Sequence, residues 1–191
     1  MTNDLRAAVV LLGALALLTG IVYPLAVTGI AQVVFPSAAS GSLLVVDGRV
    51  RGSSLIGQPF SAPGYFWSRP SATSPVPYNA AASAGSNLGP TNPALMAAVQ
   101  ERVAALRAAD PGLTGPVPVD LVTASASGLD PDISPAAALV QVPRVARARG
   151  LREELLHQLV RTHIESRAFG FVGEPRVNVL ALNLALDRLR P

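Results

Sequence analysis

Hydrophobic residues dominate the start of the chain and set it apart from everything that follows. No charged side chain occurs between Ala7 and Val46, and Ala7–Thr28 is almost wholly apolar. As a helix rising about 1.5 Å per residue, Ala7–Thr28 would reach roughly 33 Å, enough to cross the hydrocarbon core of a bilayer. The pattern predicts a transmembrane helix and its exit over residues 7–34, after a short N-terminal tail of residues 1–6.

Two other interpretations of this stretch fit less well. A cleaved signal peptide has an apolar core of about 7–15 residues, and this stretch is longer, although Ser37, Ala38 and Ala39 resemble a cleavage site. A buried helix of a soluble protein would show a polar face, which is missing here. We therefore interpret the stretch as one uncleaved membrane anchor.

Small residues define one face of the predicted anchor. Gly13, Ala16 and Gly20 fall into line because spacings of three, four and seven residues share a helix face. Such a stripe lets a partner helix approach closely, so we predict partner contacts at all three positions. Tyr23 fits an interfacial aromatic residue, and Pro24 is expected to loosen the last turn.

The charges that flank the anchor indicate its orientation. Arg6 precedes the apolar stretch, and Asp47, Arg49 and Arg51 are among the first charges after it. Because arginine near the ends of a membrane helix favours the cytoplasmic side, Arg6 favours a cytoplasmic N-terminus. The soluble domain, residues 41–191, is then expected outside the cytoplasm.

The soluble part mixes strand-like and helix-like patterns, which predicts a single α/β (α+β) domain. Gly41–Val46 and Val50–Ile56 are expected to form a hairpin around Asp47-Gly48. Asn92-Pro93 and Ser134-Pro135 each combine a capping side chain with proline at the first helical position. The remaining predicted features are a buried helix stripe at Leu95, Val99, Val103 and Leu106 ending at Asp110-Pro111-Gly112, a buried strand over Val117–Ala124, a helix break at Pro143, a helix over Leu151–Ser166, a strand over Val177–Ala181 and a helical turn over Leu182–Leu189.

The segment Phe60–Pro93 is rich in proline yet carries large aromatic side chains, namely Tyr65, Phe66, Trp67 and Tyr78. A flexible linker would normally lack such side chains, so we expect an ordered loop of the kind that carries recognition. Within it we assign Trp67 to the domain core. Arg69 is assigned to a partner interface, because its guanidinium can anchor a carboxylate or carbonyl group.

Composition excludes several classes of function. The chain contains no cysteine, which removes disulfides, thiol catalysis and thiolate metal sites. A net charge of +3 is too small to indicate nucleic-acid binding without a clustered basic face. The chain also has no Walker or dinucleotide-binding motif.

The most polar turn of the second half is better explained by capping than by metal binding. Asp130, Asp132 and Ser134 imitate the first ligands of a calcium loop. Pro135 then stands where the loop needs glycine, and Gln141 where it needs a bidentate glutamate. We therefore predict no metal site and interpret the turn as a strand-to-helix connection.

No other residues form a catalytic constellation. His157 and His163 lie about 240° apart on one helix, so they cannot share a metal locally. Ser125 and Ser127 lack the G-x-S-x-G setting of a nucleophile. The arginine run is more readily a solvated helix face than a phosphate site, although an acidic partner could also use it; it comprises Arg144, Arg147, Arg149 and Arg152.

Several ordered motifs resemble the KdpC family, the C subunit of the bacterial Kdp potassium-transporting P-type ATPase. The similarity covers nearly the whole chain in order. The motifs are Gly20-Ile21-Val22-Tyr23-Pro24, Gly52-Ser53-Ser54-Leu55-Ile56-Gly57-Gln58, Tyr65-Phe66, Arg69-Pro70-Ser71-Ala72, Tyr78-Asn79, Gly85-Ser86-Asn87-Leu88, the run from Val119 to Asp130, the run from Gln141 to Ala146, and Val177-Asn178-Val179-Leu180.

The resemblance implies a non-catalytic subunit of a complex that imports K⁺ at the expense of ATP. Its expected partners are the ATP-hydrolysing and K⁺-translocating subunits in the bacterial inner membrane. The family member is described as a catalytic chaperone that raises the ATP affinity of the pump subunit. Gln141 falls in the stretch to which family nucleotide contacts are assigned, and we count Tyr78 and Asn79 with Arg69 as partner contacts.

Two functions from different classes remain open. The first is an assembly and regulatory subunit without a cofactor of its own. The second is a nucleotide-binding subunit that contacts ATP within the complex through Gln141 and nearby arginines. A cytoplasmic N-terminus would place Gln141 on the side of the membrane that lacks ATP, and no phosphate cradle is evident. An anchored hydrolase has no supporting residues.

Overall fold

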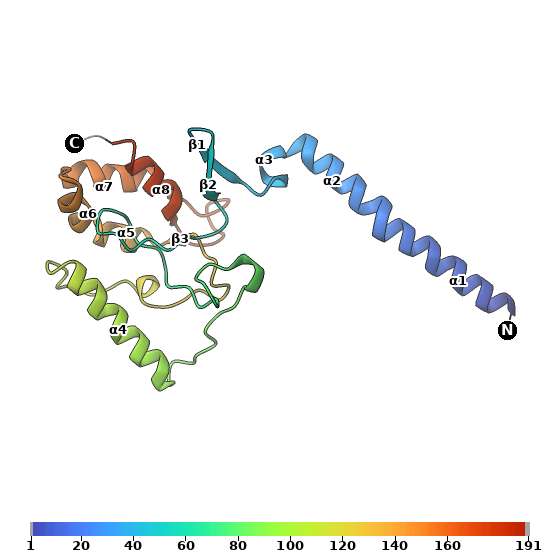
Figure 1. Ribbon diagram of the computed structural model, residues 1–191, viewed down its shortest axis with the longest axis horizontal. Coiled ribbons are helices and arrows are strands. Elements are labelled where there is room, and N and C mark those ends of the chain that lie inside the picture. Colours follow the sequence, from blue (N-terminus) through green and yellow to red (C-terminus); the bar gives the residue numbers. More distant parts are fainter. Residues whose placement is uncertain (1, 190–191) are drawn as a thin grey trace. The chain divides into compact units, whose positions relative to one another are not determined.

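The computed structural model describes residues 2–189, which divide after Arg51 into two compact units (Figure 1). The helices are α1 (Thr2–Leu17), α2 (Tyr23–Val34), α3 (Pro36–Ala39), α4 (Pro93–Ala109), α5 (Pro135–Val140), α6 (Val142–Arg149), α7 (Glu153–Thr162) and α8 (Val179–Leu186). The strands are β1 (Leu43–Val46), β2 (Arg49–Ser53), β3 (Asp132–Ile133), β4 (Ile164–Glu165) and β5 (Arg176–Asn178).

The first unit is dominated by the predicted anchor. Helices α1 and α2 join through a π-helical turn at Leu18–Val22, and Asn3–Val34 is long and apolar enough to cross a membrane. Its apolar window buries nothing against the rest of the chain, as expected for a surface that lipid or a partner covers. The helix already begins at Thr2, within the segment expected to be a short tail.

Pro24 explains the π-helical turn. Proline has no backbone N–H, so it cannot donate to the carbonyl four residues earlier, at Gly20. The helix widens instead, and the Tyr23 amide donates to the Leu18 carbonyl. Pro24 was expected to loosen the last turn, but the helix continues to Val34 because the wider turn absorbs the misfit.

The anchor leads into a hairpin of β1 and β2, as predicted. Asp47 and Gly48 have φ of 52° and 71°, which matches the two left-handed residues of a type I′ turn. Strand β2 ends at Ser53 instead of continuing to Ile56.

The second unit holds a small antiparallel sheet with strand order β3-β5-β4. Val177 of β5 is fully buried and lies opposite both Ile133 and Ile164. Helices α5 and α8 pack against β5, and α7 contacts α5, α6 and α8. The fold is therefore an α+β domain, as the mixed patterns predicted.

The core lies between this sheet and helices α5 to α8, while α4 runs along the opposite side of the unit from α8 (Figure 1). Of the stripe predicted on α4, Leu106 is buried, whereas Val99 and Val103 pack against the core more loosely. The largest fully buried side chains are Phe66, Leu156, Leu182, Leu186, Val142, Val145, Val160, Val177, Val179 and Asn183.

Local capping signals were predicted correctly. The Asn92 side chain accepts a hydrogen bond from the Ala94 amide at 2.9 Å, and Ser134 Oγ accepts one from the Ala137 amide at 3.1 Å. The predicted break near Pro143 separates α5 from α6, which ends at the left-handed Gly150.

Three further predicted elements were wrong in type or length. Val117–Ala124 is not a strand but holds a 3₁₀ turn at Val119–Leu121, and Asp120 within it accepts a 2.6 Å hydrogen bond from the Ser134 amide. Helix α7 ends at Thr162, because Ile164 and Glu165 pair with β5. Strand β5 ends at Asn178, whose side chain caps α8 by accepting from the Ala181 amide.

Candidate functional site

Two buried amide side chains hold the aromatic loop. Gln141 accepts a hydrogen bond from the Trp67 amide at 2.7 Å and donates to the Trp67 carbonyl at 3.2 Å. Asn183 does the same for Phe66, at 2.9 Å in both directions. These four bonds imitate the ladder that strands would supply on either side, so the loop is ordered without belonging to a sheet. We call Gln141 and Asn183, with Phe66 and Trp67, the amide clamp.

Arg144 completes the amide clamp from α6. Its side chain donates to the Pro63 and Tyr65 carbonyls at 2.6 and 3.0 Å, and to the Gln141 side chain at 2.6 Å. The guanidinium also lies 4.3 Å from the centre of the Trp67 ring. Burial lowers the pKa of Arg144 to about 10, so the group still carries its charge at neutral pH.

The arginine run is therefore not simply a solvated helix face. Arg144 is only 4% exposed, and Arg149 is partly covered because it donates to the Gly64 carbonyl and pairs with Asp187. Of the three arginines in α6, only Arg147 keeps a largely exposed side chain, beside Asp110. Sequence spacing could not reveal this difference, because the covering loop comes from far away in the chain.

Arg69 lies just beyond the amide clamp and is held by Asp130. Its Nη1 atom is 2.9 Å from Asp130 Oδ2, and both side chains keep about a quarter of their surface exposed, at 24% and 29%. Arg69 Nε is buried without a hydrogen-bond partner among the described residues. The exposed quarter of the side chain, not Nε, is the part that could meet an oxygen atom from outside the domain.

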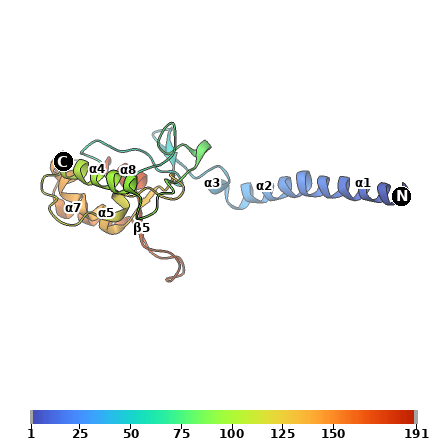
Figure 2. The ribbon, with the colours of Figure 1, turned by 90° about the horizontal axis from the view of Figure 1, so that it is seen from below.

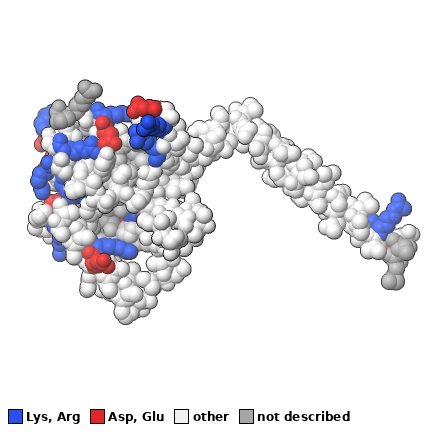
Figure 3. Space-filling view, viewed as in Figure 1, with Lys and Arg blue, Asp and Glu red and all other residues white. Residues whose placement is uncertain are grey.

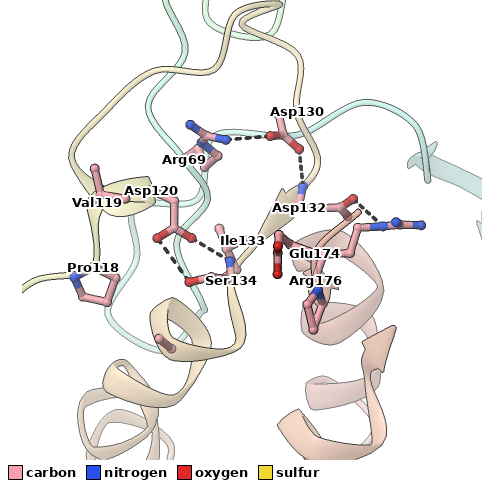
Figure 4. Close-up of a pocket in the computed structure, with 12 residues that line it drawn as sticks. Arg69, Pro118, Val119, Asp120, Asp130, Asp132, Ile133, Ser134, Glu174 and Arg176 are labelled. Atoms are coloured by element: carbon pink, nitrogen blue, oxygen red, sulfur yellow. Dashed lines mark hydrogen bonds and ion pairs between the residues drawn. The ribbon is translucent and has the colours of Figure 1, made fainter. Parts of the chain in front are cut away.

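Two hollows of about 540 Å³ each meet at the Arg69–Asp130 pair. In the first, shown in Figure 4, a second ion pair joins Asp132 to Arg176 at 3.0 Å. Asp120 accepts from the Ser134 amide and hydroxyl on the other side of the same hollow. Burial raises the pKa of the Asp132 carboxyl, and Arg176 opposes that shift.

Tyr78 and Asn79, the other predicted partner contacts, form hydrogen bonds within the loop that carries Arg69. The Tyr78 hydroxyl donates to the Arg69 carbonyl, and burial raises the pKa of this phenol. The Tyr78 ring lies so close to Gly57 that a Cβ there would approach it to 2.3 Å. Asn79 accepts from the Ala81 amide and donates to the Ser74 carbonyl. Their polar groups therefore act inside the loop.

The predicted candidates thus fall into three separate places. Arg69, Tyr78 and Asn79 belong to one loop, whereas Gln141 lies in the core beneath it, 3% exposed. The third place is the anchor helix, which carries Gly13, Ala16 and Gly20. A Cβ added at Gly13 or Gly20 would meet nothing of this chain within 4 Å.

The rejected metal and catalytic candidates have structural partners. The Asp130 carboxylate accepts from the Asp132 amide, and Ser134 caps α5. His163 ends α7 with Nδ1 2.8 Å from the Leu159 carbonyl. Residues 2–189 hold no group of three histidine or carboxylate side chains that could bind a metal ion.

Sequence reasoning missed Asn183. It stands in the segment Val179–Leu186, which is otherwise wholly apolar, and its side chain is 2% exposed. A lone amide in an apolar helix signals a buried hydrogen-bond partner, since an unpaired buried amide is destabilising. That signal was available but could not identify Phe66 as the partner.

Charged side chains do not gather by sign on the face of the second unit in Figure 3, where arginines and acidic residues are interspersed. The anchor helix shows no charge between its N-terminal end and the second unit in the same view. This face of the second unit therefore presents no large field of a single sign.

Comparison with known proteins identifies the family. The KdpC family, described as K⁺-transporting ATPase, c chain, matches residues 5–188. The potassium-transporting ATPase KdpC subunit of Methylibium petroleiphilum is 66% identical over 191 residues, covering 100% of both chains. The corresponding subunit of Polaromonas naphthalenivorans is 64% identical, and the match covers 100% of this chain and 97% of that subunit. The subunit of Methylococcus capsulatus is 62% identical, and the match covers 100% of both chains. This chain therefore belongs to the KdpC family of potassium-transporting ATPase subunits.

Proposed function

We propose that this chain is a non-catalytic, membrane-anchored subunit that assists assembly of a potassium-importing ATPase and stimulates its ATP-hydrolysing subunit. Membership of the KdpC family makes it a component of a K⁺-transporting ATPase. Its expected partners are the ATP-hydrolysing and K⁺-translocating subunits, on which it acts through contacts between proteins.

The saturated hydrogen bonding of Gln141 is the observation that supports this role over direct nucleotide binding. A glutamine amide offers two donors and two acceptor positions. Here Trp67, Arg144 and Ala137 use all of them inside the domain. A nucleotide could engage Gln141 only after the amide clamp opened, which would leave buried Trp67 and Arg144 groups unpaired.

The alternative function is a nucleotide-binding subunit that contacts ATP together with the pump subunit. Arg147 keeps a side chain that is 60% exposed and could meet a phosphate from solvent. This role requires the second unit to reach the ATP-containing side of the membrane. We favour the first function, because Arg6 favours a cytoplasmic N-terminus and hence an extracytoplasmic second unit.

A topology experiment separates these two possibilities. We propose a single-pass protein of the bacterial inner membrane with its N-terminus in the cytoplasm. Alkaline phosphatase fused to the C-terminus should then be active, whereas a cytoplasm-dependent fluorescent protein at the same place should stay dark. The reverse pattern would reject the proposed orientation and restore the nucleotide-binding alternative.

Assembly and activity test the proposed role directly. The ATP-hydrolysing and K⁺-translocating subunits should be expressed with and without this chain, purified through a tag on one of them, and assayed for K⁺-stimulated ATP hydrolysis. We expect the complex without this chain to dissociate or lose stimulation by K⁺. Full recovery and full activity without this chain would reject the proposal.

A further inference from the structure

The connection between β4 and β5 forms a second, well-defined hairpin, which projects beyond the helices of its unit (Figure 2). Ala168 and Val172 exchange two backbone hydrogen bonds of 2.9 Å each, and the Phe171 amide donates to the Ala168 carbonyl at 3.3 Å. Phe169 and Gly170 form the turn with φ of 54° and 82°. We call Ala168–Val172 the hairpin tip.

The hairpin tip exposes apolar side chains to an unusual degree. Phe169 is 89% exposed, Phe171 77% and Val172 51%. Phe169 also adopts the left-handed conformation, which asparagine and glycine accept far more readily than a bulky side chain. Neither the exposed rings nor the strained residue stabilises the isolated chain. We therefore infer that they contact another molecule.

Ion pairs join the two arms of this hairpin at its base and leave it without net charge. Arg167 pairs with Glu174 at 2.6 Å, and Arg176 pairs with Glu165 at 2.7 Å. Surfaces that insert into anionic bilayers usually combine apolar residues with unpaired basic ones. The hairpin therefore lacks the charge that a lipid surface would select.

We propose that the hairpin tip docks into an apolar pocket on the extramembranous surface of another subunit of the ATPase, with Phe169 and Phe171 as anchors. Preformed aromatic anchors lose little conformational freedom on docking, and such side chains dominate binding energy in protein interfaces. A second copy of this chain is a poorer occupant, because the hollows beside Arg69 are lined by ion-paired charges that do not suit a phenyl ring.

Replacement of the anchors tests this inference, which rests on the proposed role as a subunit. In the full chain, Phe169→Asn with Phe171→Thr keeps an Asn-Gly turn and strand-compatible side chains, so folding should be unharmed. We expect the thermal midpoint to stay equal or rise. Recovery of this chain with its tagged partner subunit should fall at least about tenfold. Met96→Gln, at an apolar position 53% exposed on α4, is the matched control and should assemble normally.

A photo-crosslinker identifies the occupant. Benzoylphenylalanine at position 169, in the intact complex, should crosslink to another ATPase subunit that mass spectrometry identifies. Crosslinks confined to lipid or to a second copy of the chain, or unchanged recovery of the double variant, would overturn the hairpin proposal alone. If even the unaltered chain failed to purify with the other subunits, the proposed subunit role would fall as well.

Discussion

At the scale of single residues, the amide clamp is where buried polar groups decide the structure. Gln141 and Asn183 satisfy every backbone donor and acceptor of Phe66 and Trp67, two residues that no strand accompanies. The contribution of such a side chain to stability does not follow from its own exposure or charge. Its importance lies in the groups that would lose their partner if it were removed.

Replacing Gln141 with alanine should therefore destabilise the second unit. The change leaves Trp67 backbone groups and part of the Arg144 guanidinium buried without partners, which we expect to cost about 2–4 kcal/mol of unfolding free energy. Because Trp67 is the only tryptophan, its fluorescence during urea unfolding of the full chain in detergent measures this directly. Gln158→Ala, at an exposed position of α7, is the matched control and should change stability by less than about 0.5 kcal/mol.

Arg69 should matter for activity more than for stability. Its ion pair with Asp130 is partly exposed, so Arg69→Ala should lower the unfolding free energy by at most about 1 kcal/mol. K⁺-stimulated ATP hydrolysis by the assembled complex should nevertheless fall, since the exposed part of the guanidinium would no longer reach a partner. Arg107→Ala, at an exposed position of α4, serves as control. A fully active Arg69→Ala complex would disprove the interface role.

Asp132 predicts a pH dependence of stability. Its pKa is raised above the ordinary 3.8, chiefly by burial, so the folded chain holds the proton more tightly than the unfolded chain. The resulting stabilisation is present below pH 3.8 and is lost as pH rises through the folded pKa. The unfolding free energy of Asp132→Asn should therefore increase relative to that of the unaltered chain as pH rises from acidic to neutral, as unfolding titrations at several pH values would measure. A constant difference would contradict this shift.

At the scale of elements, the sequence predicted helix caps and turns correctly, because interactions between neighbouring residues determine them. The Asn92 and Ser134 caps and the Asp47-Gly48 turn all depend on neighbouring residues, and all were predicted correctly. Val117–Ala124 looked like a strand because of its β-branched residues. Its conformation is set instead by Asp120, which bonds the distant Ser134.

Among the candidate site residues, sequence could suggest Arg69 but not its surroundings. The Asp130 partner, the two hollows and the amide clamp all join segments far apart in the chain, and no periodic pattern encodes such pairs. The family resemblance pointed to Gln141 as a nucleotide contact. Its hydrogen bonds support a structural role that spacing alone could not indicate.

The anchor helix should contribute to assembly through close packing. Gly20→Ile adds volume on the predicted small-residue face, where lipid offers no compensating hydrophobic gain for a lost helix contact. Because a Cβ at position 20 would meet nothing beyond its own helix within 4 Å, folding should be preserved. We expect reduced co-purification with the other subunits. Gly29→Ile, equally open but outside that face, is the control, and equal recovery of both variants would refute the packing role.

At the scale of the whole molecule, division into an apolar helix and an α+β unit fits a protein that works by position within a complex. The full chain in detergent should therefore show no saturable ATP binding tighter than about 0.1 mM, equivalent to roughly −5.5 kcal/mol. Isothermal titration calorimetry at physiological salt measures this. Tighter binding that Arg147→Ala abolished, but the exposed-site variant Arg107→Ala did not, would favour the nucleotide-binding function instead.

The amide clamp also sets the order in which the parts of the chain can fold during synthesis. Phe66 depends on Asn183, 117 residues later, so its backbone groups stay unpaired until α8 has been made. Asn183 lies in α8, and closing a loop of 117 residues carries an entropic cost. A nascent chain can thus place its anchor in the membrane early, whereas its second unit closes only after α8 has been made.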